Sequence, residues 1–402
     1  MSRFLQLVPV REAQETIASL APEPRVEQVA LESAAGRVLA EDIRAGHDIP
    51  GFDRSIVDGY ALLAADTVGA SESLPAMLRY SGRVSMGQSD TPPEVTPGTC
   101  TYVPTGGFLP PGADAAVMVE NTESSGDLVL IKKTVAPQEN VLRFNEDFAK
   151  GELVLPKGHR FTPQDIGVLA ATGTVRVPVT VQPVIGILST GNELVPATEE
   201  PRMGQVRDVN SFMIAAFVRE IGCVPRSYGI VRDERDSFEA AMSSAAAECD
   251  AVLISGGSSK DDRDMTVQVL SALGEVKIHG VALAPGKPTI IGRIGTKPVL
   301  GLPGHPGAVF VVMSVIGKAM IGKMTGLDIS RPKTTRAELA VNIPSQKGRE
   351  EYIRVHLENG KAYPLFGKSG LLNTLVRSDG MIRIPDLCEG LEQGDTVEVL
   401  LW

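Results

Sequence analysis

The sequence predicts a multidomain protein of the α/β plus β class. From Val181 to about Met324, strand and helix patterns alternate, which is typical of βαβ units around a parallel sheet. Residues 51–144 combine short apolar runs with frequent Pro and Gly, which indicates a β-rich region. Residues 335–402 contain short alternating strands, which indicate a small β-barrel or sandwich. A chain of 402 residues has the length for roughly two to four such domains.

Composition favours a cytoplasmic protein that binds neither nucleic acid nor a membrane. The net charge of −10 argues against nucleic-acid binding, because phosphate contacts require a basic surface. The four cysteines are scattered, which disfavours a zinc site or a disulfide framework and fits a reducing compartment. The N-terminus lacks a secretory signal pattern. The apolar run 308–316 is cut by Lys318, so we expect it to be too short to span a bilayer.

The first 180 residues are predicted to hold short helices between extended segments. Residues 9–20 have the spacing of an amphipathic helix, and residues 26–31, which follow two prolines, are predicted to be extended. Residues 32–45 are predicted to be helical before Gly46. Another helix is predicted over 163–172, in a region punctuated by Gly and Pro.

The α/β region is predicted to contain four buried strands and four helices. Short apolar runs predict strands at 184–188, 224–230, 251–254 and 299–302. Amphipathic or apolar segments predict helices at 211–220, 237–248, 265–272 and 308–324. Residues 331–333 are predicted to be a linker before the C-terminal strands, which include 351–357 and 396–402.

Three of the predicted strands end in loops of small and polar residues. Because the carboxyl ends of parallel strands meet at one edge of a sheet, these loops are expected to lie together. Glycines allow close backbone approach, and free N–H groups with serine hydroxyls suit a phosphate or oxyanion. A tight solvated turn explains any one loop equally well, but three together favour a ligand site. The candidate residues are Ser189, Thr190, Gly191, Ser255, Gly256, Gly257, Ser258, Ser259, Pro303, Gly304, His305 and Pro306.

Charged residues follow the same strands. Glu193, Asp233 and Asp264 are carboxylates near the predicted edge, where oxygen ligands shared with phosphate would suit Mg²⁺. Lys287 lies in a Pro-Gly-Lys-Pro turn that would direct a cation towards the ligand. Asp208 is more simply a cap of the helix that follows it.

Two Pro- and Gly-rich motifs stand out in the β-rich region. The first, PGFDRSIVDGYA at 50–61, places two carboxylates, a serine and an aromatic around a glycine turn. The second is TGGFLPPGADA at 105–115. Taken by themselves, both motifs are satisfied by ordinary turns.

Together with the α/β loops, the two motifs resemble those of the molybdopterin molybdenumtransferase family, which includes the C-terminal domain of gephyrin. Further matches follow the family order along nearly the whole chain: GRVLAED at 36–42, GELVLPKG at 151–158, STGNEL at 189–194, SGG at 255–257, PGKP at 285–288 and GLPGHP at 301–306. Any single match is weak, whereas the ordered set is specific.

The resemblance implies an elongated four-domain homodimer. An N-terminal helix (1–26) would join an α/β/α molybdopterin-binding domain III (181–330). The arm would consist of domain I (27–50 and 145–180) and the β-rich domain II (51–144), and residues 331–402 would form the β-barrel domain IV. The implied reaction inserts molybdate into adenylylated molybdopterin and releases AMP with the help of Mg²⁺.

The resemblance also implies site residues. The family's catalytic positions fall on Asp58, Thr105, Asp147, Glu193, Asp233 and Asp264, and the last three would hold Mg²⁺ or orient ligand groups. Pro303 and Pro306 match further positions, and Arg354 and Ser369 in the tail match more loosely. The 255–259 loop and Lys287 would hold phosphate or the pterin. In a dimer, Asp58, Thr105 and Asp147 of one chain would face the α/β domain of the other.

Three departures from the family pattern lie at the predicted ligand edge. The sequence GGSSKD at 256–261 stands where the family usually has Gly-Gly-Val-Ser-Val-Gly. Ala284 replaces a lysine, and His305 replaces an asparagine. One cation is therefore lost while Lys260 adds another, which leaves molybdate or tungstate open as the oxyanion.

Other functions stay open beside the transferase. A non-catalytic relative would carry molybdopterin or act as a scaffold; the retained Asp58, Glu193 and Asp264 argue against it, and Ala284 argues for it. A molybdopterin adenylyltransferase would share the α/β domain but not the β-rich insertion, and that enzyme and the cofactor-accepting enzymes are candidate partners. An unrelated nucleotide phosphohydrolase is disfavoured, because no hydrolase motif is present.

Overall fold

The computed structural model describes residues 6–87, 93–256, 260–329 and 332–402, and they form two compact units. Unit 1 comprises Met1–Glu41, Lys157–Thr162 and Arg176–Trp402, and unit 2 comprises Asp42–Pro156 and Pro163–Val175. Each unit is described by itself. The finer division into an N-terminal helix and domains I to IV stays a prediction.

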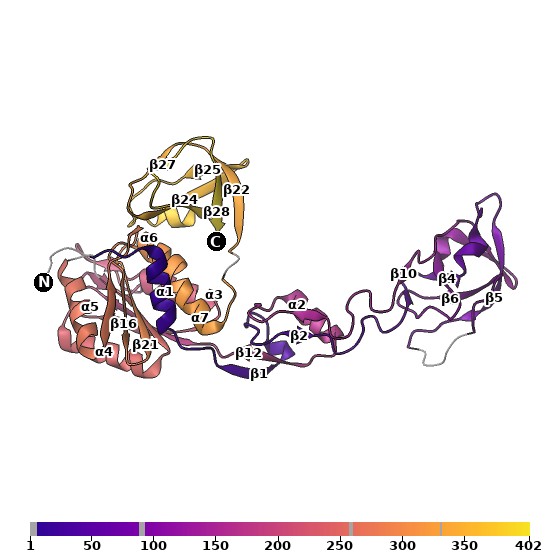
Figure 1. Cartoon of the computed structure of the whole chain (residues 1–402), viewed down its shortest axis with the longest axis horizontal. Coiled ribbons are helices and arrows are strands. Elements are labelled where there is room, and N and C mark those ends of the chain that lie inside the picture. The colour runs from indigo at the N-terminus through magenta and orange to yellow at the C-terminus, as the bar shows by residue number, and fades with distance from the viewer. Residues whose placement is uncertain (1–5, 88–92, 257–259, 330–331) are drawn as a thin grey trace. The chain divides into compact units, whose positions relative to one another are not determined.

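A six-stranded sheet in the order β16-β13-β17-β21-β20-β18 forms the centre of the α/β part of unit 1 (Figure 1). Its strands are β13 (Val184–Thr190), β16 (Val224–Val231), β17 (Ala251–Ser255), β18 (Glu275–His279), β20 (Ile290–Ile294) and β21 (Lys297–Leu302). Strands β16, β13, β17 and β21 are parallel, as predicted. Strand β20 runs antiparallel to both of its neighbours. Neither β18 nor β20 was predicted.

Helices cover both faces of this sheet and make it a three-layer α/β/α structure. They are α1 (Val10–Leu20), α3 (Asn210–Glu220), α4 (Arg235–Glu248), α5 (Lys260–Leu273), α6 (Pro306–Val312), the π-helical turn η4 (Met313–Gly317) and α7 (Lys318–Thr325). On one face, α1, α3 and the α6–α7 helix bury one core cluster with Ile187 and Leu253. On the other face, α4 and α5 bury a second cluster with Val252 and Ile254. The helices predicted at 9–20, 211–220, 237–248, 265–272 and 308–324 are therefore all present.

The α6–α7 helix is longer than the sequence indicated. It continues from Pro306 to Thr325 over 20 residues with a mean hydropathy of 1.6, so by length and composition it could cross a membrane. The expectation that Lys318 cuts the apolar run too short is therefore wrong, because Lys318 continues the helix. Within the protein, 72% of this segment is buried, which is typical of the core helix of a globular domain.

The segment after α1 contains strands instead of the predicted helix at 32–45. Strand β1 (Val26–Ala30) pairs with β12 (Arg176–Thr180), and only the short 3-10 turn η1 (Leu31–Ser33) is helical. Val38 and Leu39 are buried and bridge to Arg160 and Val179. The prediction is wrong because this long-range pairing overrides a local preference for helix.

Unit 2 is β-rich, as predicted, and its main sheet has the order β7-β4-β6-β5-β9-β8. The strands are β4 (Gly59–Leu62), β5 (Ala76–Arg83), β6 (Thr99–Val103), β7 (Ala115–Met118), β8 (Thr122–Ser125) and β9 (Leu128–Ile131). The short turn η3 (Val119–Asn121) joins the two edge strands β7 and β8, so the sheet curls around an apolar interior. Smaller elements complete the unit: η2 (Ala64–Thr67), β2 (Ile43–Arg44) with β11 (Leu153–Leu155), β3 (Arg54–Ser55) with β10 (Val141–Leu142), and α2 (Pro163–Ala171).

The C-terminal part of unit 1 is a closed five-stranded β-barrel. Its strands follow the order β24-β25-β22-β28-β26, and β26 pairs back with β24. They are β22 (Thr334–Leu339), β24 (Glu350–Glu358), β25 (Lys361–Pro364), β26 (Gly380–Ile384) and β28 (Thr396–Leu401). Strand β19 (Leu283–Ala284) of the α/β part pairs with β24, so the barrel is joined to the α/β part by backbone hydrogen bonds. Short elements fill the connections: β14 (Leu194–Val195), β15 (Val206–Arg207), β23 (Ile343–Pro344), β27 (Gly390–Leu391) and α8 (Asn373–Val376).

Candidate functional site

The carboxyl ends of three parallel strands lie in register at one edge of the sheet. Ser189 of β13 is paired with Ser255 of β17, and Ser255 is paired with Leu302 of β21. The loops that begin at Gly191, Gly256 and Pro303 therefore start side by side. This is the edge at which open α/β sheets bind their ligands.

The loop after β13 is held by Asp233. The Thr190 hydroxyl donates a hydrogen bond to Oδ1 of Asp233, and the backbone N–H of Asn192 donates to Oδ2 at 3.0 Å. Gly191 has a positive φ of 154°, and a Cβ added there would lie 2.7 Å from Oε2 of Glu193. The Glu193 carboxylate therefore lies over the glycine, in a loop whose shape Asp233 fixes.

Asn210, at the start of α3, links the other two loops. Its Nδ2 donates to Oγ of Ser255 at 2.9 Å and to the carbonyl oxygen of Gly304 at 2.8 Å. The residue is only 8% exposed. Within the described residues, the buried Oδ1 of Asn210 and Oγ of Ser189 have no hydrogen-bond partner, so this edge keeps polar atoms unsatisfied. Sequence reasoning missed Asn210, whereas Asp208 caps the helix through the backbone N–H of Ser211, as predicted.

The loop after β21 contacts the C-terminal barrel region. Nδ1 of His305 lies 2.9 Å from Oγ of Ser369, and the backbone N–H of Gly307 donates to the carbonyl oxygen of Ser369 at 2.9 Å. Pro306 begins α6, where its missing N–H leaves no hydrogen bond unmade. The structure thus brings the neighbours His305 and Pro306 together with Ser369, which lies about sixty residues later in the sequence.

A cavity of about 430 Å³ lies beside this loop, between the α/β part and the barrel. Four predicted residues line it: Lys287, Pro303, His305 and Ser369. Lys347 and Arg349, from the turn before β24, also line it, and sequence reasoning missed both. Three cationic side chains therefore surround a space of the size that small-molecule ligands occupy.

A second cavity of about 340 Å³ adjoins the first, because Ala284, Pro285 and Ser369 line both. Arg354 of β24 lines the second cavity although it is only 6% exposed. A Cβ added to Gly307 would lie 2.6 Å from its Nη1, so the guanidinium packs against the first turn of α6. Burial lowers the pKa of Arg354. Its Nε has no hydrogen-bond partner among the described residues, and a buried cation of this kind attracts an anion.

The two motifs of the β-rich region lie together in unit 2. Oδ1 of Asp58 accepts a hydrogen bond from the backbone N–H of Thr105 at 2.8 Å. Ser55 exchanges backbone hydrogen bonds with Gly106 and Gly107, at 2.8 and 2.9 Å. Asp147 follows β10 in the same unit, where its backbone N–H donates to Ile49 at 3.0 Å. Asp58, Thr105 and Asp147 are all exposed.

The predicted metal ligands do not form a three-carboxylate cluster among the described side chains. Both oxygens of Asp233 accept one hydrogen bond each, from Thr190 and Asn192, and each keeps a further lone pair, so Asp233 as a metal ligand stays a prediction. Glu193 does fit, because Mg²⁺ is commonly held by one or two carboxylates together with phosphate oxygens of a substrate. Asp264 lies in α5, with a side chain beyond those described, and Gly257, Ser258 and Ser259 lie outside the described residues.

Models of protein families match the chain in three consecutive segments. Residues 8–173 match the MoeA N-terminal region, described as domains I and II. Residues 186–323 match a molybdopterin-binding domain, and residues 336–402 match the MoeA C-terminal region, described as domain IV.

Full-length relatives and solved structures are similar to the chain throughout. A molybdopterin biosynthesis protein of Methanocaldococcus jannaschii is 35% identical, with all of both chains covered. The molybdopterin molybdenumtransferase of Bacillus subtilis is 34% identical over 98% of this chain and 94% of the relative. The crystal structure of the molybdopterin biosynthesis moeA protein of Pyrococcus horikoshii OT3 is 36% identical, with a TM-score of 0.85 and coverage of 99% of this chain and 100% of that one.

Proposed function

Because the chain belongs to the molybdopterin molybdenumtransferase (MoeA) family, a family of transferases in molybdenum cofactor biosynthesis, we propose that it inserts molybdate into adenylylated molybdopterin and releases AMP. The substrate of this reaction carries phosphates, and the incoming molybdate is itself a dianion. The site must therefore stabilise clustered negative charge.

The observation that carries the proposal is the group of cations around the two adjoining cavities. Lys287, Lys347 and Arg349 line the larger cavity, and the buried Arg354 lines the smaller one. Arg354 lies against the start of α6, where the positive end of the helix dipole also favours an anion. These groups suit the phosphates of the substrate or the oxyanion.

The strand-edge loops would position the substrate beside the cations. Asn210 fixes the β17 loop against the β21 loop, and Asp233 fixes the β13 loop that carries Glu193. Glu193 would be the carboxylate available to a Mg²⁺ ion, which would neutralise phosphate charge when AMP leaves. A homodimer in which Asp58 of one chain reaches the α/β domain of the other is part of the proposal, as is action in the cytoplasm.

The cations also bear on the lost family lysine at Ala284. Ala284 lines both cavities, and Lys347 and Arg349 line the larger cavity with it. The barrel therefore places two cations, which are paired with Glu389 and Glu351, next to the position from which the lysine is missing. This supports catalysis over a carrier role.

Release of AMP from the purified protein tests the proposal. We expect adenylylated molybdopterin to yield AMP only after an oxyanion is added, and the amounts of AMP released by equal amounts of molybdate and tungstate identify the preferred one. EDTA should abolish the release, and an excess of Mg²⁺ should restore it. AMP would be measured by chromatography, and the cofactor by activation of a cofactor-free molybdoenzyme.

A Lys287→Met variant tests the cavity, with Lys297→Met as the control because Lys297 lies on β21 and lines neither cavity. We expect about a tenfold or greater loss of AMP release for the first variant and no loss for the second. Tight binding of the nucleotide without AMP release under either oxyanion would instead make the protein a carrier or scaffold.

A further inference from the structure

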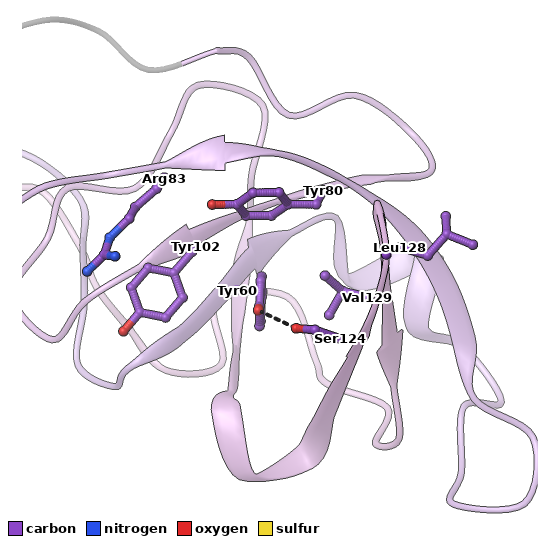
Figure 2. A pocket seen from close by; sticks show the side chains of 8 residues that line it. Tyr60, Tyr80, Arg83, Tyr102, Ser124, Leu128 and Val129 are labelled. Carbon is purple, nitrogen blue, oxygen red and sulfur yellow. Dashed lines mark hydrogen bonds between the residues drawn. The ribbon is translucent and has the colours of Figure 1, made fainter.

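Unit 2 contains a cavity that the proposed reaction does not use. It has a volume of about 420 Å³ and is lined by residues of the curled sheet (Figure 2). Strands β4, β5, β6, β8 and β9 and the turn between β8 and β9 provide its lining: Tyr60, Tyr80, Arg83, Tyr102, Ser124, Gly126, Leu128 and Val129. The mouth of a curled or closed β-sheet is a common place for a small-molecule site.

Three of the eight residues that line the cavity are tyrosines. Tyr60 and Tyr102 face each other across the β4–β6 pair, with ring centres 5.7 Å apart and planes at 83°. The ring plane of Tyr60 also makes an angle of 82° with that of Tyr80, with ring centres 6.4 Å apart. Tyr60 is fixed by a hydrogen bond of 3.2 Å between its hydroxyl and Oγ of Ser124, as Figure 2 shows. Tyr60 is 8% exposed and Tyr80 is 41% exposed, so a rigid floor and a solvent-accessible wall meet at this cavity.

One cation completes the cavity. Arg83 lies on β5, next to β6, and its guanidinium is 5.0 Å from the centre of the Tyr102 ring on β6 (Figure 2). No described carboxylate pairs with Arg83, and the described lining contains no acidic side chain. The site therefore combines aromatic faces, phenol hydroxyls and one positive charge that no described side chain neutralises.

We propose that this cavity binds a small ligand with a planar aromatic ring and an anionic group, of the chemical class of a nucleoside monophosphate. The tyrosine rings offer stacking or edge contacts to the ring, and Arg83 and the hydroxyls bind the anion. An ammonium ligand would be repelled by Arg83. A proline-rich peptide would need an extended aromatic groove, whereas these rings surround one compact cavity.

Matched probes separate the two parts of the ligand. Calorimetry on the full-length protein would compare AMP, adenosine and inorganic phosphate. We expect AMP to bind more tightly than either of the others. Arg83→Leu should weaken the binding of AMP about tenfold or more and leave the binding of adenosine nearly unchanged. Tyr80→Leu should weaken the binding of both ligands. Arg79→Leu, on the same strand but outside the cavity, should change neither.

The position of the probe must also be mapped, because AMP is the product of the proposed reaction and would bind at the cations of unit 1. Photo-cross-linking with azido-AMP, followed by peptide mass mapping, should label peptides that contain Tyr80 or Tyr102, and Arg83→Leu should remove that label. Labelling confined to unit 1, or binding unaffected by Arg83→Leu and Tyr80→Leu in variants that keep the wild-type melting temperature, would overturn the proposal. Cross-linking tests the cavity of unit 2, and the AMP-release assay tests the enzymatic function. Labelling of unit 2 would support the cavity even if the protein released no AMP, so either proposal can be rejected without the other.

Discussion

Arg354 is the residue on which the charge of the proposed site depends most. Arg354 is almost fully buried, and no carboxylate of the described part of the chain pairs with it. A cation in this position destabilises a folded protein, because its charge has lost most of its water. Such a residue is retained where an anion compensates it in the working state. We therefore expect Arg354 to contribute to function at some expense of stability.

Replacing Arg354 by methionine should separate these two effects. Methionine keeps most of the buried volume and removes the charge, so we expect the free energy of unfolding to stay level or rise by about 1 kcal/mol. AMP release should fall about tenfold or more, since a charged contact to the substrate is lost. Thermal unfolding and the release assay measure the two quantities.

The matched control is Arg336→Met, because Arg336 is exposed on β22 and lines neither cavity. This variant should change neither the melting temperature nor the rate of AMP release. Full activity of Arg354→Met would show that its guanidinium does not touch the substrate.

At single positions, sequence reasoning identified residues that lie in recognisable motifs and missed those that do not. Lys287, His305 and Ser369 were all named, and the structure gathers them around one cavity. Lys347 and Arg349 stand in an ordinary polar turn, and only the pairing of β19 with β24 brings them to the cavity. Nothing local in the sequence indicates that pairing.

At the scale of elements, the first turn of α6 shows how closely two parts of the chain must approach. Gly307 gives Arg354 and the carbonyl oxygen of Ser369 room against the helix. A Cβ at this position would lie 2.6 Å from Nη1 of Arg354 and 2.8 Å from that oxygen. Glycine inside a helix usually costs about 1 kcal/mol relative to alanine, so its presence here has a packing reason.

Gly307→Ala should therefore destabilise the protein, by about 1–3 kcal/mol, although helix propensity alone predicts a gain. Gly167→Ala in α2 is the control, since a Cβ there meets no atom within 4 Å. That variant should gain about 0.5–1 kcal/mol. Denaturant unfolding of both variants tests the pair, and a stabilised Gly307→Ala protein would contradict the close packing.

The elements that were predicted correctly and those that were missed differ in what stabilises them. The parallel strands and the helices of the α/β part have strong apolar patterns of their own, and all were recognised. Strands β18 and β20 are held by antiparallel partners, and β20 turns directly into β21 at Gly295, which has a positive φ. The region of Val38 and Leu39 is extended only because distant backbone pairs with it. Long-range pairing of this kind leaves little trace in local sequence.

At the scale of the whole molecule, the proposed homodimer predicts that two inactive chains can restore one working site. Asp58→Asn and Lys287→Met change different units of the chain. If a partner chain supplies Asp58, a heterodimer of the two variants has one site with both changes and one with neither. We expect such a heterodimer, purified through two tags, to reach about half of the wild-type rate.

Each variant homodimer should be inactive in the same assay, and size-exclusion chromatography should show the dimer in every sample. A heterodimer no more active than the two homodimers would place Asp58 and Lys287 in a site made by one chain.

Unit 1 is built from three separate segments of the chain, and this affects the order in which the protein folds during translation. Unit 2 is complete once Val175 has left the ribosome, so it is the first part that can fold as a whole. Helix α1 is made earlier, but Ala13 and Ile17 pack in one core cluster with Leu300, Ile316 and Met320. Helix α1 must therefore wait, with its apolar face uncovered, until the α6–α7 helix has been synthesised. Nascent chains stalled before the α6–α7 helix should be the ones that recruit chaperones.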